Sequence, residues 1–114
     1  MDMFTGYLEE RIAALKAEAA ELEKNYRQDD AVFVKIRINV YDVCKTVFGV
    51  FKKMKSDESL CGEYLKKLDE FEKTWSASLE KAKEFGDSKK AAAEEAKLSA
   101  LADVRGKFVE VFAK

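Results

Sequence analysis

Residues 8–26 read LEERIAALKAEAAELEKNY, and they show more clearly than any other run what this chain folds into. Apolar side chains recur there at alternating steps of four and three residues: Leu8, Ile12, Leu15, Ala19, Leu22 and Tyr26. This spacing is typical of a helix whose apolar seam packs against other helices. The residues between are mainly Glu, Lys, Arg and Ala, which are strong helix formers. The sequence therefore predicts a helix over about residues 3–27.

The next segment, about residues 30–55, allows two interpretations at its start. Val32, Val34, Ile36, Ile38 and Val40 alternate with other residues and are β-branched, which is typical of a strand. A helical seam covers the same residues and continues well beyond them: Phe33, Ile36, Val40, Val43, Val47, Val50 and Met54. Because the helical pattern is longer, we predict a helix here and keep a strand at its start as the alternative.

The sequence leaves open whether these first two helices are separate. Asp29 or Asp30 could cap a new helix, which favours a break. The seam nevertheless passes through Asp29 without a shift, and neither Gly nor Pro intervenes. An unbroken helix would be about 80 Å long and would need a partner to cover it.

Two further helices are predicted, over about residues 56–85 and 88–113. Ser56 and the acids after it are typical of a helix start. Gly86 suits the left-handed position that ends many helices, and Asp87 or Ser88 can begin the next one. Apolar stripes follow in both segments, and the stripe of the first includes Trp75.

These elements predict one all-α domain over residues 1–114, an antiparallel bundle of four helices, or of three if the first two are continuous. Charge supports this topology, since the four segments carry net charges of −2, +3, −4 and +2, which sum to the net −1 of the chain. Neighbouring helices would then carry opposite signs. A compact chain of this length has a radius of gyration near ~13 Å.

Composition excludes many chemistries. The 114 residues contain no histidine and no Gly-rich phosphate loop, so imidazole catalysis and nucleotide motifs are absent. Cys44 and Cys61 are too widely spaced for a zinc site, and we expect two buried free thiols. We expect no metal and no cofactor, and the chain shows no sequence repeat.

Charge and hydropathy limit which partners and which cellular compartment we expect for this chain. An isoelectric point of about 5.6 and only four arginines argue against a nucleic-acid partner. No run is long and apolar enough for a membrane span, and no leader-like basic and apolar segment begins the chain. We therefore expect a cytoplasmic protein with neither a nucleic-acid nor a membrane partner.

The apolar face of the segment over residues 30–55 covers about four of every seven positions, more than one seam needs. Tyr41, Phe48 and Phe51 lie on the extra part of this face and are our candidate interface residues. Asn39, beside the seam, could fix the register between helices. Asp42 and Lys45 are three residues apart, so we expect an ordinary surface ion pair.

The function predicted from these features is not enzymatic. We expect a small helical protein–protein interaction module that self-associates, as a homodimer, and that could also bind another protein partner through an apolar face. The alternative is a protein that binds a small apolar ligand within the bundle core.

Overall fold

The computed structural model describes residues 3–54 and 57–112 and contains four helices over these residues: α1 (Met3–Lys24), α2 (Gln28–Met54), α3 (Asp57–Glu84) and α4 (Ser88–Phe112). No strand occurs in the described ranges, and the β-branched run over 32–40 lies within α2. The all-α antiparallel bundle is therefore confirmed, with the first two helices separate. The cap expected at Ser56 lies outside the described residues.

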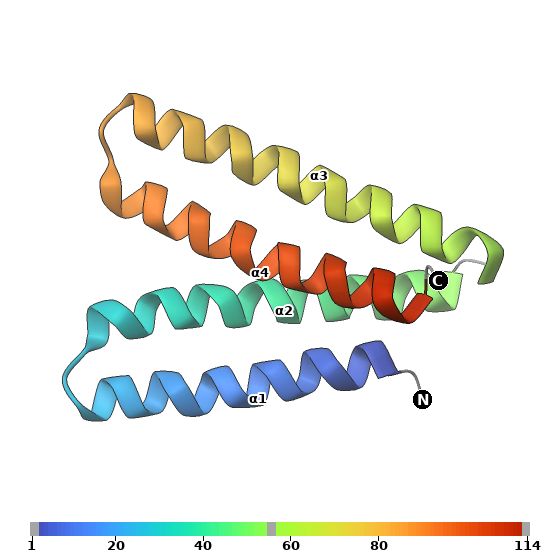
Figure 1. Ribbon diagram of the computed structural model, residues 1–114, viewed down its shortest axis with the longest axis horizontal. Helices are drawn as coiled ribbons and strands as arrows, with labels where there is room; N and C mark the ends of the chain where they lie inside the picture. Colours follow the sequence, from blue (N-terminus) through green and yellow to red (C-terminus); the bar gives the residue numbers. More distant parts are fainter. Residues whose placement is uncertain (1–2, 55–56, 113–114) are drawn as a thin grey trace.

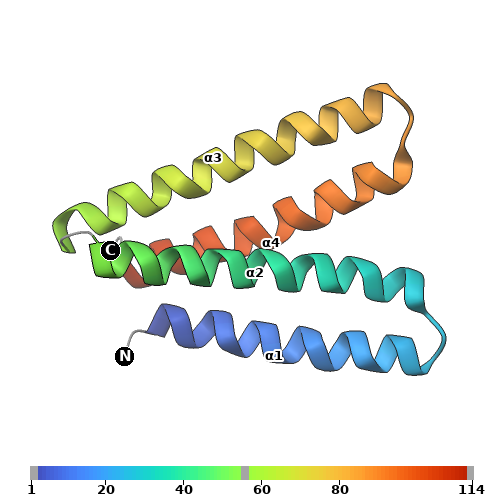
Figure 2. The same cartoon turned by 180° about the vertical axis from the view of Figure 1, so that it is seen from behind.

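The bundle consists of two helical hairpins, α1–α2 and α3–α4, joined mainly through α2 and α4 (Figures 1 and 2). Helices α2 and α4 lie at the centre, α1 covers α2 and α3 covers α4. The hairpins converge at the end where the chain termini lie, and they splay apart toward their two turns (Figure 1). Helix α3 consequently makes few contacts with α2, and α1 few with α4.

The break between α1 and α2 occurs at Tyr26. This residue takes a left-handed conformation with φ of 60°, which is unusual for a side chain other than glycine. The amide of Tyr26 donates to the carbonyl of Glu23 and the amide of Arg27 to that of Leu22, the pattern that closes many helices. Helix α2 begins at Gln28, so Asp29 and Asp30 lie in its first turn rather than before it.

The turn between α3 and α4 repeats this geometry with a residue better suited to it. Gly86 has φ of 70°, and the amides of Gly86 and Asp87 donate to the carbonyls of Lys83 and Ala82. The carboxylate of Asp87 accepts a hydrogen bond of 3.1 Å from the amide of Lys90, so Asp87 caps α4. The roles expected for Gly86 and Asp87 are thus confirmed.

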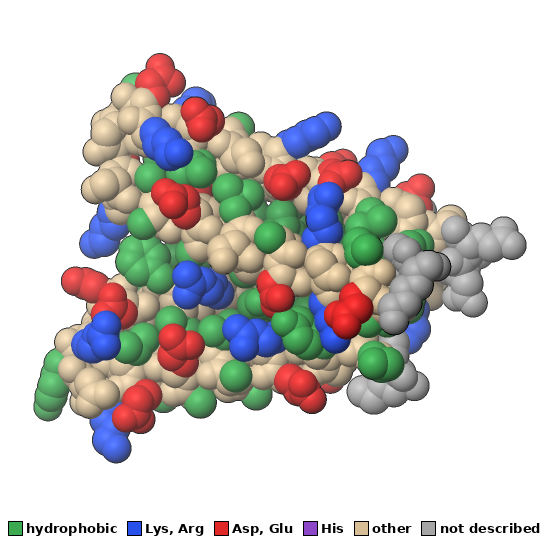
Figure 3. Space-filling model, in the orientation of Figure 1, with side chains coloured by type: hydrophobic (Ala, Val, Ile, Leu, Met, Phe, Trp, Pro, Cys, Tyr) green, Lys and Arg blue, Asp and Glu red, His purple; other side chains and the backbone are tan. Residues whose placement is uncertain are grey.

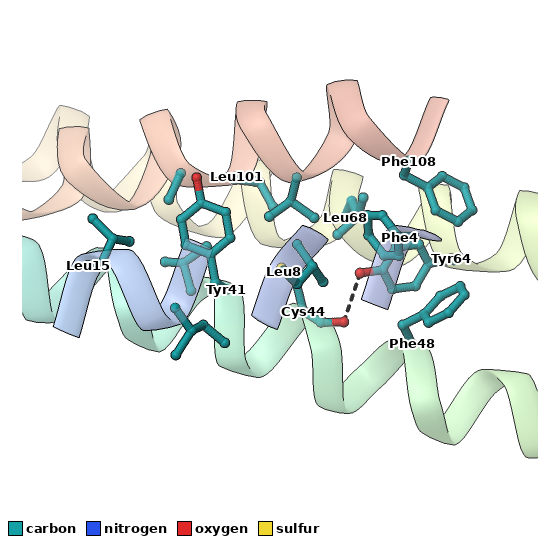
Figure 4. Close-up of a cluster of buried hydrophobic side chains, with 14 of the residues drawn as sticks. Phe4, Leu8, Leu15, Tyr41, Cys44, Phe48, Tyr64, Leu68, Leu101 and Phe108 are labelled. Carbon is teal, nitrogen blue, oxygen red and sulfur yellow. Dashed lines mark hydrogen bonds between the residues drawn. The ribbon is translucent and has the colours of Figure 1, made fainter. Parts of the chain in front are cut away.

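Aromatic rings fill the core where the four helices converge (Figure 4). Phe4, Phe48, Tyr64 and Phe108 are almost fully buried and contact one another with ring centroids 4.8–6.1 Å apart, mostly edge to face. The Tyr64 hydroxyl donates 2.8 Å to the backbone carbonyl of Cys44, which satisfies the only polar atom of that ring.

The two hairpins are structurally equivalent although their sequences differ. Buried positions of α2 recur in α4 sixty residues later: Ala31/Ala91, Val34/Glu94, Val40/Ala100, Tyr41/Leu101, Cys44/Val104 and Phe48/Phe108. The left-handed turn residues, Tyr26 and Gly86, have the same spacing. The molecule therefore has approximate two-fold symmetry between its hairpins. At one pair of matching positions the first hairpin has the apolar residue Val34 and the second has the charged residue Glu94.

The splayed arrangement makes the molecule larger than the sequence analysis predicted. Its radius of gyration is 15.3 Å rather than ~13 Å, and its extents are 45 × 34 × 22 Å. Figure 3 shows acidic and basic side chains interspersed over one face, with hydrophobic side chains visible in the opening between the hairpins. The bundle is compact at one end only.

Candidate interaction surface

The three candidate interface residues lie on the inner side of α2. Tyr41 is 3% exposed and Phe48 1%, because α4 packs on that side of the helix, and Phe51 is half-buried. All three pack in or against the core of a single chain. The exposed part of the wide apolar face of α2 is therefore formed by residues other than these three.

We give the name outer stripe to the apolar residues along the side of α2 opposite Tyr41: Val32, Ile36, Val43, Val47, Val50 and Met54. Ile36 and Val43 adjoin Trp75 of α3, and Val47 packs against the core. Four of them are exposed, Val32 by 49%, Val43 by 42%, Val50 by 46% and Met54 by 74%, and the other two are half-buried. Helical geometry places all six within about 60° of one another around the axis. The outer stripe runs along the whole helix, which at 1.5 Å per residue is about 40 Å long.

Polar residues flank the outer stripe. Asn39 is exposed beside Ile36 and Val43, as its position next to the seam suggested. Acidic residues occupy the first turn of α2, and Lys52 and Lys53 occupy its last turn. The helix surface is therefore polarised from an acidic start to a basic end.

The surface ion pair expected between Asp42 and Lys45 is not formed. The Lys45 ammonium instead lies 3.9 Å from the Glu9 carboxylate on α1. Lys45 projects toward the neighbouring helix of its own hairpin, and this contact competes with an attraction along α2 that is weak in water.

A polar cluster that the sequence analysis missed joins three helices on the opposite side of α2. The Tyr7 hydroxyl donates 2.9 Å to the Asp103 carboxylate, and the Tyr41 hydroxyl donates to the same carboxylate at 2.5 Å. Arg11 lies over the Tyr41 ring at 5.9 Å. Burial, and then the hydrogen bond to Asp103, raise the pKa of Tyr41 to about 12. No spacing in the sequence signals this cluster, because its members come from α1, α2 and α4.

The two cysteines are free, as expected, but they differ in burial. Cys44 is fully buried, and burial raises the pKa of its thiol to about 12. Such a thiol stays protonated near neutral pH and is a poor nucleophile. Cys61 is half-buried rather than buried.

The hollows found on this molecule lie at its surface, between helices. One of about 680 Å³ is lined by polar and apolar residues of α1, α2 and α4, including Arg37 and Glu95. A smaller one of about 120 Å³ adjoins the outer stripe and Trp75. None of the five hollows is lined by the core rings Phe4, Phe48 or Tyr64.

Two further features bear on what the described residues can do. They include no group of three or more acidic or cysteine side chains placed to hold a metal ion. Within the same ranges, none of the helices has the length and apolar character needed to cross a membrane.

Comparisons with known proteins found nothing similar: no family model, no curated protein and no solved structure matches this chain.

Proposed function

We propose that this chain is a non-catalytic, cytoplasmic helical module that self-associates as a homodimer through the outer stripe of α2. The observation that carries the proposal is the row of exposed Val and Met side chains along a helix at the centre of the molecule. Water-exposed apolar patches of this kind mark interaction sites in soluble proteins.

The exposed surface area of the chain supports an interface of standard size. The chain exposes 7245 Å², whereas a compact monomer of 12.9 kDa exposes roughly 6,300 Å². The excess, roughly 900 Å², is close to the ~800 Å² that each partner contributes to an interface of standard size. The splayed hairpins thus expose about as much additional surface as one such interface covers.

The charges of α2 favour a second copy as the partner. Two copies of α2 packed antiparallel bring the acidic first turn of each, with Asp29, next to the basic last turn of the other, with Lys53. This is the arrangement of a two-fold dimer, in which the same patch is used on both subunits. In this register Asn39 of one copy lies opposite Val43 of the other, so its polar side chain favours this alignment only from the edge of the contact.

Sedimentation velocity over a range of protein concentrations tests the proposal. We expect wild type to dimerise, and Val43→Asp or Val50→Asp to weaken the dimer about 100-fold, because each places a charge in a dry contact. Ala17→Asp is the matched control, since Ala17 is exposed on α1 and away from the outer stripe. A dimer that all three variants leave unchanged would place the interface elsewhere.

A further inference from the structure

Arg37 of α2 is half-buried, and its charge has no partner among the residues that the structure describes. The equivalent residue of the second hairpin, Lys97, does have one. Its ammonium lies 3.0 Å from Oε1 of the buried Glu94, whose other oxygen accepts no hydrogen bond from a described residue. Glu94 precedes Lys97 by three residues, and Val34 occupies the matching place before Arg37. Arg37 therefore lacks the carboxylate that its counterpart has, and a half-buried charge without one is unfavourable.

Arg37 borders two adjoining hollows. The first, of about 680 Å³, lies between α1, α2 and α4, whose hairpins splay apart toward their turns (Figure 1). The second, of about 300 Å³, surrounds the cluster of Tyr7, Tyr41 and Asp103. Arg37 lines both hollows. Two tyrosine hydroxyls already donate to Asp103, so the second hollow has a satisfied polar group where the first has unmatched ones.

The first hollow combines an apolar lining with charges that are not matched. Within it, Arg27 and Asp30 form an ion pair of 2.6 Å and neutralise each other. Glu18 of α1 and Glu95 of α4 are exposed, and neither pairs with Arg37 or with another described residue. One positive and two negative groups thus remain without a partner. The apolar lining comes from the same three helices: Leu22, Phe33, Val34, Ala92 and Ala96.

We propose that this hollow binds a short apolar peptide with both of its termini free. The terminal carboxylate lies over Val34 and pairs with the Arg37 guanidinium, as the Glu94 carboxylate pairs with Lys97. A guanidinium suits this role, because it can donate two parallel hydrogen bonds to one carboxylate. The terminal ammonium pairs with Glu18 or Glu95, and the apolar side chains lie against the apolar lining.

Charge and size both favour a peptide over simpler ligands. The two glutamates would repel a dianion such as a phosphate monoester, whereas a peptide with free termini offers a partner to both signs of charge. At ~30 Å³ of liquid volume per water-sized group, the hollow holds on the order of 20 non-hydrogen atoms, which is about three residues. A single amino acid would leave most of the space to water.

Titrations with leucyl-alanyl-leucine and two blocked forms of it, followed by NMR of the protein amides, test the site. The C-terminal amide removes the negative charge of the peptide, and the N-acetyl form removes its positive charge. We expect saturable shifts around Arg37 with the free peptide. Each blocked form should bind about 10-fold more weakly, because each leaves a charged group of the hollow unpaired.

Variants assign each terminus of the peptide to its partner. Arg37→Gln should abolish the preference for the free carboxylate over the amide. Replacing both Glu18 and Glu95 by glutamine should abolish the preference for the free ammonium over the N-acetyl form. Val34→Glu places a carboxylate three residues before Arg37, as in the second hairpin, and should block the peptide. Lys66→Gln is the matched control, since Lys66 is exposed on α3 and does not line the hollow.

The peptide site is independent of the proposed dimer, because no residue of the outer stripe lines this hollow. Val50→Asp should therefore bind the peptide as wild type does, even if the chain proves to be a monomer. Circular dichroism of each variant verifies that the helices are retained. Three outcomes would overturn the inference: no saturable shifts with the free peptide, a blocked form that binds equally well, or a preference for the free carboxylate that Arg37→Gln retains.

Discussion

Single residues carry both the strain and the polar contacts of this fold. Tyr26 accepts an unfavourable left-handed backbone at a turn where the other hairpin has glycine. Its side chain is 88% exposed, so the ring contributes little in return. The hydrogen bonds of the turn and the packing of α1 on α2 hold the residue in this conformation.

Exchanging the turn residues should therefore have opposite effects. We expect Tyr26→Gly to raise the free energy of unfolding by about 0.5–1 kcal/mol, since it removes the strain and few contacts. Gly86→Ala should lower it by about 1 kcal/mol through backbone strain alone, because an added Cβ would meet no atom within 4 Å. Urea unfolding measures both, and a loss of stability in Tyr26→Gly would show that the exposed ring matters.

The Tyr41–Asp103 contact predicts a dependence on alkaline pH. The pKa of Tyr41 is raised from its ordinary 10.0 to about 12, so the folded state holds this proton more tightly than the unfolded state does. The resulting stabilisation is complete below pH 10 and is lost as the pH rises toward 12. We expect the stability of Tyr41→Phe to fall less over this window than that of wild type, as measured by urea unfolding. Parallel losses in the two proteins would contradict the assignment.

Individual helices follow closely from the sequence. The heptad seams place all four helices to within a few residues, and Gly86 and Asp87 mark the second turn correctly. The first turn could not be decided, because the seam continues through it and Tyr26 carries no signal for a left-handed backbone. Closure of the hairpin, a tertiary effect, determines that break.

The equivalence of the hairpins is likewise hidden from the sequence. Packing requires buried positions at matching places, but residues as different as Tyr41 and Leu101 satisfy it. The largest departure from this equivalence lies in the two central helices, where Val34 of α2 matches Glu94 of α4.

We expect Glu94→Val to raise the free energy of unfolding by about 1 kcal/mol, because an incompletely partnered carboxylate is replaced by an apolar group. Lys97, a third exposed, can then return to water. The reverse change, Val34→Glu, should lower stability by about 1–3 kcal/mol, since it buries a carboxylate whose available partner is Arg37, three residues further along the helix. Chemical unfolding of the two variants compares them directly, and a destabilised Glu94→Val would mean that the Glu94–Lys97 pair contributes net stability.

In the complete fold, α2 is apolar beyond the needs of one seam, as its sequence indicates. The pattern led us to expect the surplus at Tyr41, Phe48 and Phe51, whereas the structure leaves the outer stripe exposed. The outer stripe and the row that contains Tyr41 and Phe48 both have helical spacing. Only the placement of α4 therefore decides which of the two is buried. The splay of the hairpins, which leaves the radius of gyration at 15.3 Å, depends on the same packing and has no signature in one sequence.

Light scattering of the wild-type protein at increasing concentration tests self-association most directly. If the outer stripe of α2 joins two copies, the molar mass should rise to twice the 12.9 kDa of the chain. A mass that stays at 12.9 kDa up to the highest soluble concentration would contradict the homodimer.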